Sequence, residues 1–194
     1  MSTAVMTERI KETSPSLKPR IAGVFYLLCF VTAISALLVR GRLGLVAGLT
    51  AGVCYVAVTL LFYYIFKPVS RGLSLLAAVI SLAGCAIGPL SLLVHAASPI
   101  HPLVFFGFYC LLIGYLIFKS TFLPRILGGL MALAGLGWLT FVYPPLANRL
   151  SPYVFAPGIL GEGALTLWLL VFGVNDQRGQ ERQRGKSGPR VRRA

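Results

Sequence analysis

Glu162 is the residue whose position in this sequence carries the most chemical information. It is the one acidic residue inside a long apolar run, VFAPGILGEGALTLWLLVFGV. A charged side chain near the centre of a membrane helix costs about 2.5–3.5 kcal/mol on insertion scales, so such residues face protein or water and mark functional sites. Gly158 and Thr166 lie four residues to either side, on the same helix face. We expect this stripe to face the interior of a helical bundle.

The partners that we expect for Glu162 come from the outer half of the membrane. At a rise of ~1.5 Å per residue, Glu162 lies ~12 Å inside the run that starts at Val154. The expected partners are Thr166 and either His95 or Arg149, whose side chains would reach Glu162 from the outer side. A protonated acid bonded to a backbone carbonyl is the alternative. The sequence therefore leaves two roles open, a structural one and a proton- or ligand-linked one.

The histidines and cysteines favour no cofactor. The two histidines, His95 and His101, are separated by AASPI, which predicts a loop and disfavours a shared haem. The cysteines form no Cys-x-x-Cys pair, and one falls in each of the first four apolar runs. Without a nearby cation to stabilise thiolates, they are expected to be small apolar fillers. These cysteines are Cys29, Cys54, Cys85 and Cys110.

Catalytic arrangements are also missing from the sequence. The one aspartate, Asp176, follows the last apolar run and is expected on the cytoplasmic side. Both histidines are expected near the outer face, so Asp176 cannot join either of them in a Ser-His-Asp set. No phosphate-binding glycine loop and no cluster of carboxylates are present. These observations lean against an enzyme, and an enzyme acting on a lipid or a quinone is the least favoured class.

The elements that must position Glu162 are six apolar runs. The chain is 57% hydrophobic and 12% charged, whereas a soluble domain is about 25% charged. A membrane-spanning helix needs ~20 apolar residues. The sequence therefore predicts an all-α, six-transmembrane-helix bundle over residues 21–174, with spans Ile21–Val39, Leu43–Phe66, Leu73–Ala97, Pro102–Phe118, Ile126–Ala147 and Val154–Val174.

The charge distribution predicts the orientation of the bundle. All but three of the 18 Lys and Arg residues lie in the two tails and in the second and fourth loops; the exceptions are Arg40, Arg42 and Arg149. This is the positive-inside pattern, which predicts that both termini are cytoplasmic. Residues 1–20 and 175–194 are then cytoplasmic tails. The basic segment Arg178–Arg193 is expected to be disordered and to contact anionic lipid headgroups, not nucleic acid.

Small residues at helical spacing predict close packing between the spans. Glycines recur every fourth residue, and in lipid such stripes let helix backbones approach each other. We expect contacts within the bundle, with a homo-oligomer or a membrane-protein partner as the alternative. Both tryptophans, Trp138 and Trp168, lie well inside runs and are expected to pack in the bundle. The glycines concerned are Gly44, Gly48, Gly52, Gly84, Gly88 and Gly114.

Three stretches resemble a known family. They are FYYIFKPVSRGLSLLAA, FFGFYCLLIGYLIFKSTFLPRILGGLMALAGLGWL and GEGALTLWLLVFGV, joined by RIAGVFYLL in the first run. They are similar to the bacterial membrane proteins grouped as the domain of unknown function 4386 family. The resemblance implies a fold and a bacterial membrane location, and no activity. The chain departs from it in the first outer loop, which is cut to Arg40-Gly41-Arg42.

The sequence leaves two functional classes. The favoured class is a small permease-like or ligand-binding bundle, or an accessory subunit of one, centred on Glu162. The second is a structural or interaction protein whose glycine faces meet the helices of a partner. A Glu162 that faces a water-filled cavity would favour the first class. A Glu162 sealed against one hydrogen-bond partner, together with an exposed glycine stripe, would favour the second.

Overall fold

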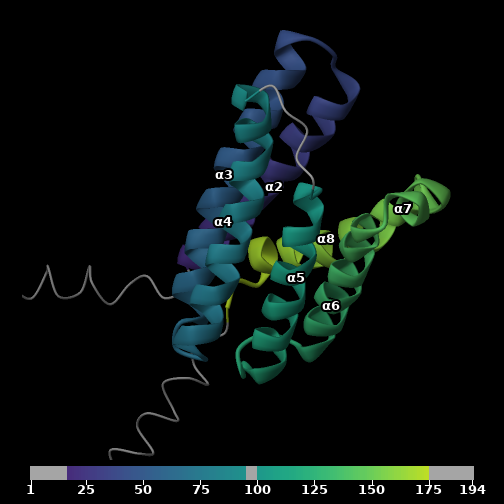
Figure 1. Ribbon diagram of the computed structural model, residues 1–194. Coiled ribbons are helices and arrows are strands. Elements are labelled where there is room, and N and C mark those ends of the chain that lie inside the picture. Colours follow the sequence, from purple (N-terminus) through teal and green to yellow (C-terminus); the bar gives the residue numbers. More distant parts are fainter. Residues whose placement is uncertain (1–16, 95–99, 175–194) are drawn as a thin grey trace, which may run out of the picture.

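Helices form because the apolar runs must satisfy their own backbone hydrogen bonds in the absence of water. The computed structural model describes residues 17–94 and 100–174, and these residues are almost entirely helical (Figure 1). Within them, six stretches are long and apolar enough to span a membrane. The all-α architecture with six candidate spans is therefore confirmed. Most of the two predicted tails, including Arg178–Arg193, lies outside the described residues, as does His95.

The helix ends fall within a few residues of the predicted runs. Most of them begin with a basic residue or a proline, both of which suit the border between apolar core and water. The helices are α2 Leu17–Leu38, α3 Arg42–Phe66, α4 Arg71–Val94, α5 Pro102–Lys119, α6 Arg125–Leu139, α7 Pro144–Leu150 and α8 Ala156–Val171, with 3₁₀ turns η1 Thr140–Val142 and η2 Tyr153–Phe155.

The fifth run is divided differently from the expectation. We expected one helix over Ile126–Ala147, whereas α6 ends at Leu139 and the short α7 begins at Pro144. Proline disfavours a helical conformation in the residue before it, and Tyr143 is extended, with φ −119° and ψ 92°. The candidate span is consequently Arg125–Val142, and α7 forms a separate turn between two spans.

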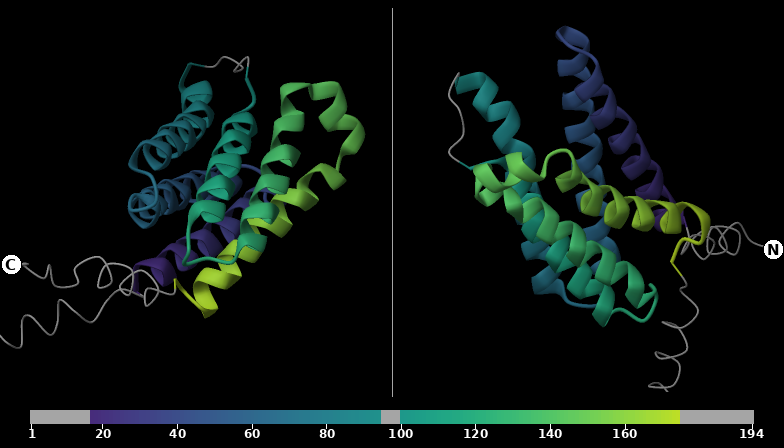
Figure 2. Two further views of the ribbon diagram at one scale, coloured as in Figure 1. Left: turned by 90° about the horizontal axis from the view of Figure 1, so that it is seen from below. Right: turned by 90° about the vertical axis from the view of Figure 1, so that its right-hand side faces the viewer.

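The six spans form a ring in chain order. Each packs mainly on its neighbours in the sequence, from α2 against α3 to α6 against α8, and α8 closes the ring on α2 (Figure 2). Side chains that point inward from opposite parts of the ring therefore meet at its centre. The fully buried ones include Tyr26, Phe62, Tyr109, Ile113 and Leu165.

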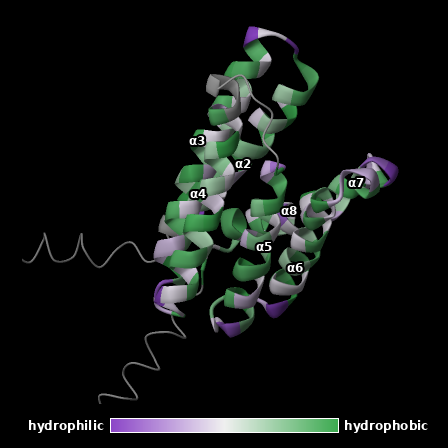
Figure 3. Cartoon of the chain, in the orientation of Figure 1, coloured by the Kyte–Doolittle hydropathy of each residue, from purple (hydrophilic) through white to green (hydrophobic). Residues whose placement is uncertain are grey.

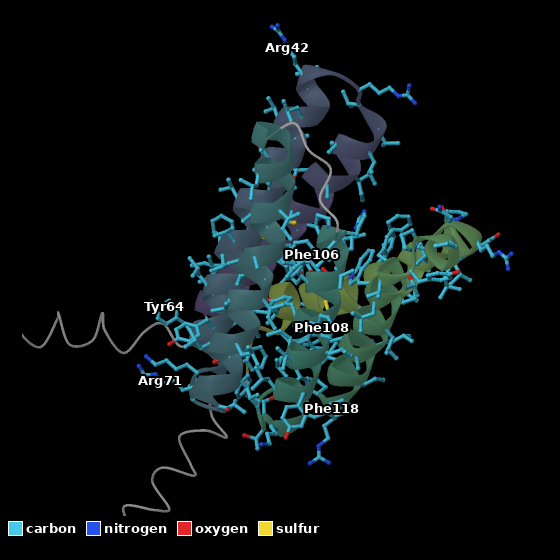
Figure 4. All side chains as sticks on the ribbon, in the orientation of Figure 1. Arg42, Tyr64, Arg71, Phe106, Phe108 and Phe118 are labelled. Atoms are coloured by element: carbon cyan, nitrogen blue, oxygen red, sulfur yellow. The ribbon has the colours of Figure 1, made fainter. Side chains whose placement is uncertain are left out.

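Polar residues lie at the ends of the spans, and apolar residues cover their length (Figure 3). Arg42, at the start of α3, lies at the opposite end of the molecule from Arg71, at the start of α4 (Figure 4). Many large apolar side chains are exposed along the outside, among them Leu43, Ile126 and Leu167. A lipid environment accounts for this surface, because lipid chains are as apolar as the side chains that they cover.

Candidate functional site

Glu162 lies on the inner face of α8. The buried residues of this helix recur at spacings of three and one, which is one face of an α-helix; they are Gly158, Gly161, Glu162, Leu165, Thr166 and Leu169. The Glu162 side chain is only 6% exposed. The structure thus buries the acid inside the helical ring, as the cost of a lipid-facing carboxyl requires.

Donors from three other helices converge on the Glu162 carboxyl. Tyr26 of α2 donates from Oη to Oε2 at 2.6 Å. Trp138 of α6 donates from Nε1 to Oε1 at 2.7 Å. The Cys110 thiol of α5 lies 3.7 Å from Oε1, a weak bond typical of sulfur. Both carboxyl oxygens therefore have a strong donor, which is the arrangement that a carboxylate anion prefers.

Two further hydroxyls lie in this interior without a hydrogen-bond partner among the described residues. They belong to Tyr55 of α3 and Tyr109 of α5, which are 8% and 1% exposed. The Tyr55 ring lies 5.8 Å from that of Tyr26, whose hydroxyl bonds Glu162, and 5.9 Å from that of Tyr109. The Tyr109 hydroxyl also lies near Thr59, but not in hydrogen-bond geometry. Most buried polar groups in proteins have partners, so these two call for an explanation.

Helix α4 contributes to the same polar interior. Ser81 of α4 and Thr59 of α3 share a buried hydrogen bond of 2.7 Å between their hydroxyls. Every span therefore supplies a polar side chain to the interior. The others are Tyr26 of α2, Tyr109 and Cys110 of α5, Trp138 of α6 and Glu162 of α8. Polar residues from six separate helices meet there because the ring turns one face of each span inward.

Two glycines allow Trp138 to reach the acid. A Cβ at Gly158 would collide with the Trp138 ring, and a Cβ at Gly161 would collide with the Leu130 carbonyl. Both glycines lie on the inner face of α8. Their missing side chains let α6 and α8 approach closely enough for the Trp138 indole to lie against α8 and to bond the carboxyl.

The expected partners of Glu162 differ from those that the structure gives it. Thr166 is buried, but its hydroxyl donates to the Glu162 backbone carbonyl at 2.7 Å and not to the carboxyl. Arg149 is an exposed residue of α7, and His95 lies outside the described residues. Sequence reasoning missed Tyr26 and Cys110. For Trp138, its mid-run position was the one available signal, and it is half-buried.

The predicted packing glycines fall into two groups. A Cβ at Gly84 or Gly114 would come within about 3 Å of a neighbouring helix, and Gly114 lies against the Gly128 backbone of α6. A Cβ at Gly44 would collide with the Val39 carbonyl in the turn before α3. A Cβ at Gly48 would be 3.8 Å from Ala36, an ordinary contact. At Gly52 and Gly88 it would meet no described atom within 4 Å. Among these predicted glycines, Gly114 thus makes a close contact with a neighbouring helix backbone, between α5 and α6.

Glu162 has no cation beside it in the part of the chain that the structure describes. Every Lys and Arg whose side chain is described is exposed, and they lie at or near helix ends. No group of three His, Cys, Asp or Glu residues that could hold a metal ion occurs among the described residues. An ionised Glu162 would therefore need a charge that this part of the protein does not supply.

Comparisons with known proteins agree with this architecture. The family model described as "Domain of unknown function (DUF4386)" matches residues 40–102 and 90–173. The chain belongs to the DUF4386 family. The match includes Glu162 and four of its neighbours, namely Tyr55, Tyr109, Cys110 and Trp138, whereas Tyr26 precedes it.

A relative of the chain comes from an archaeon. An "Uncharacterized protein" of Archaeoglobus fulgidus is 29% identical over 127 residues, which cover 61% of this chain and 76% of that protein. No solved structure matches the chain. Membership of the DUF4386 family therefore supports a multi-pass membrane protein and assigns it no activity.

Proposed function

We propose that this protein is a small permease-like bundle that binds a proton or a small ligand at Glu162. The observation that carries the proposal is the surplus of polar groups around the carboxyl. Tyr26 and Trp138 already satisfy both of its oxygens. The Tyr55 and Tyr109 hydroxyls are buried in the same interior without hydrogen-bond partners among the described residues.

A purely structural acid does not account for these extra hydroxyls. Leaving a buried polar group unpaired costs about 1–3 kcal/mol. Phenylalanine would fill almost the same volume as Tyr55 or Tyr109 at no such cost. Two unpaired hydroxyls next to one intramembrane carboxyl are better explained by a bound species that they contact in another state of the protein.

The charge balance supports a transport-like role. An ionised carboxyl without a counter-ion is costly at this depth, so Glu162 should change its charge only when a proton or a cation arrives or leaves. Binding at Glu162 would then be linked to charge movement within the ring. This linkage is what a proton- or ion-coupled permease requires.

A test of the proposal uses Trp138 as a reporter, because its indole bonds the carboxyl directly. The variant Trp168→Phe leaves Trp138 as the only tryptophan of the chain. In lipid nanodiscs, its emission should change as the pH is varied between about 4 and 10. The change should vanish in Trp168→Phe/Glu162→Gln. An emission that is independent of pH in a stably folded protein would contradict the proposal.

Other titratable groups near Glu162 must be separated from it. They are Tyr26, Cys29, Tyr55, Tyr109 and Cys110. Their ordinary pKa values, about 8.5 for cysteine and about 10 for tyrosine, lie well above that of glutamate. Comparison with Cys110→Ser and Tyr26→Phe in the same background identifies any signal that these groups contribute.

A second candidate function is that of an interaction protein, which the burial of Glu162 (6% exposed) favours. The glycines Gly48 and Gly52 of α3 leave a helix surface that no other described helix covers closely. In lipid, such a surface suits a partner helix. We place both proposed functions in a bacterial cytoplasmic membrane with both termini inside; the charge distribution supports this orientation.

A further inference from the structure

We propose that the centre of the ring binds a primary organic ammonium ion, R–NH₃⁺, between the Glu162 carboxylate and the hydroxyl oxygens of Tyr55 and Tyr109. This inference rests on the proposed function and names its ligand. It explains the two observations that the proposed function leaves general, namely the acid without a cation and the two hydroxyls without partners.

The ring of helices brings Tyr55, Tyr109 and Glu162 into one cluster. Tyr55 belongs to α3, Tyr109 to α5 and Glu162 to α8, so the three come from different parts of the ring. The rings of Tyr55 and Tyr109 lie 5.9 Å apart between centroids. The Tyr26 ring, whose hydroxyl bonds Glu162, lies 5.8 Å from that of Tyr55. The two unpaired hydroxyls thus belong to the same cluster as the acid.

A primary ammonium matches this set in number and in charge. It carries one positive charge and three N–H donors. The cluster offers one carboxylate and two phenol oxygens as acceptors. Tyr26 and Trp138 can keep their bonds to the carboxylate, because each carboxylate oxygen accepts more than one hydrogen bond.

Aromatic faces line the same interior and favour an organic cation over a metal ion. Tyr55 packs against Phe106 at 4.7 Å and edge-on against Tyr26. Ring faces attract ammonium groups through cation–π interaction, and ring edges accept an apolar substituent. Hard metal cations such as Ca²⁺ require about six to eight oxygen ligands, more than this cluster provides.

The ligand must enter through the movement of a side chain, because the three acceptor groups are buried. Phe106 is half-buried and packs directly on the Tyr55 ring. We assign to Phe106 the movement that admits the ligand. An apolar substituent on the ammonium would then take the place of the Phe106 ring beside Tyr55.

The experiment measures binding of benzylammonium to the full chain in nanodiscs by calorimetry, with empty nanodiscs subtracted. Its neutral analogue, benzyl alcohol, and benzyltrimethylammonium, which has no N–H donor, should each bind about tenfold more weakly or worse. Glu162→Gln should weaken benzylammonium binding by at least about tenfold. Tyr55→Phe and Tyr109→Phe should each weaken it several-fold. Tyr64→Phe, on the exposed side of α3, is the matched control and should have no effect.

The outcomes separate this inference from the proposed function. If Trp138 emission titrates through Glu162 but benzylammonium does not bind, the proposed function stands and the ammonium site is wrong. Equal binding of benzyl alcohol, or binding that survives Glu162→Gln, also overturns the site. Should Glu162→Gln fail to fold, Tyr55→Phe/Tyr109→Phe decides the matter. This variant removes only two oxygen atoms, so unchanged binding by it contradicts the inference.

Discussion

The two strong donors around Glu162 differ in what they can do besides donate. The Trp138 indole N–H can only donate, whereas the Tyr26 hydroxyl can donate or accept. Their bonds go to different carboxyl oxygens, Oε1 and Oε2. This asymmetry makes the carboxyl replaceable by a carboxamide, which offers one acceptor and one donor at the same positions.

Glu162→Gln should therefore affect folding much less than Glu162→Leu. In Glu162→Gln the amide oxygen accepts from Trp138 and the amide nitrogen donates to Tyr26, so both bonds survive. In Glu162→Leu both donors lose their acceptor, at a cost of about 1–3 kcal/mol each. Thermal unfolding in nanodiscs should show a small shift for Gln and a large loss for Leu. If Leu is tolerated as well as Gln, the hydrogen bonds of this cluster are not important for stability.

The same pair also separates the two roles of the residue. A protein that folds as Glu162→Gln and retains its native phenotype at every pH tested would make Glu162 a structural residue. The permease-like proposal would then be wrong, although the hydrogen-bonded cluster would remain.

At the scale of the helices, the contacts of the glycines differ more than their spacing does. A Cβ at Gly114 would lie 2.8 Å from the Gly128 carbonyl oxygen, and one at Gly161 would overlap the Leu130 carbonyl. Backbone atoms cannot move aside as a flexible side chain can. At Gly52 and Gly88, by contrast, a Cβ would meet no described atom within 4 Å.

Alanine substitutions should therefore divide these four glycines into two pairs. Gly114→Ala and Gly161→Ala should destabilise the protein by about 1–3 kcal/mol, the usual cost of overpacking. Gly52→Ala and Gly88→Ala should be neutral or stabilising by up to about 1 kcal/mol, because alanine is the better helix former. Unfolding midpoints in one detergent provide the comparison. A loss at Gly52 matching that at Gly114 would indicate an interface with a partner at α3.

His101 caps α5 through an acceptor that can be protonated. Its Nδ1 accepts from the Leu103 backbone N–H at 3.3 Å, and its ring stacks on Phe141 at 4.7 Å. His101 is exposed, but its partial burial lowers its pKa below the usual 6.5. The folded protein thus favours the neutral ring, which is the form that caps the helix.

The contribution of His101 to stability should depend on pH. It is present above the unfolded-state pKa of about 6.5 and is lost as the pH falls through the lower folded-state value. His101→Asn keeps a capping acceptor that does not titrate. The unfolding midpoint of wild type relative to this variant should therefore decrease on acidification, and a constant difference would show that the cap does not respond to pH.

For the whole molecule, orientation is the property that the charge pattern predicts most directly. The turn from Lys67 to Arg71 is basic, and so are the Lys119–Arg125 turn and the tail after residue 174. Reporters fused within the first of these turns and after residue 174 should report cytoplasm, whereas one within Ser98–Pro102 should report the outer side. A periplasmic report from the C-terminal fusion would contradict the predicted orientation.

The number and position of the spans followed from the sequence because both depend on local properties. The length of an apolar run, and a basic or proline residue at its end, can be read without knowing what the run contacts. The depth of Glu162 in its run followed in the same way. The break after Leu139 was less visible, because only the geometry of Tyr143 shows that Pro144 starts a separate helix.

The partners of Glu162 were decided by tertiary structure alone. Tyr26 is 136 residues away in the chain, and it meets the acid because α8 closes the ring on α2. In a membrane protein the outer and inner faces of a helix are similarly apolar, since lipid replaces water outside. Hydrophobic periodicity therefore cannot show which side of α2 or α6 faces inward. The sequence by itself determined six spans and one buried acid, and the closing of the ring selected Tyr26 and Trp138 as its donors.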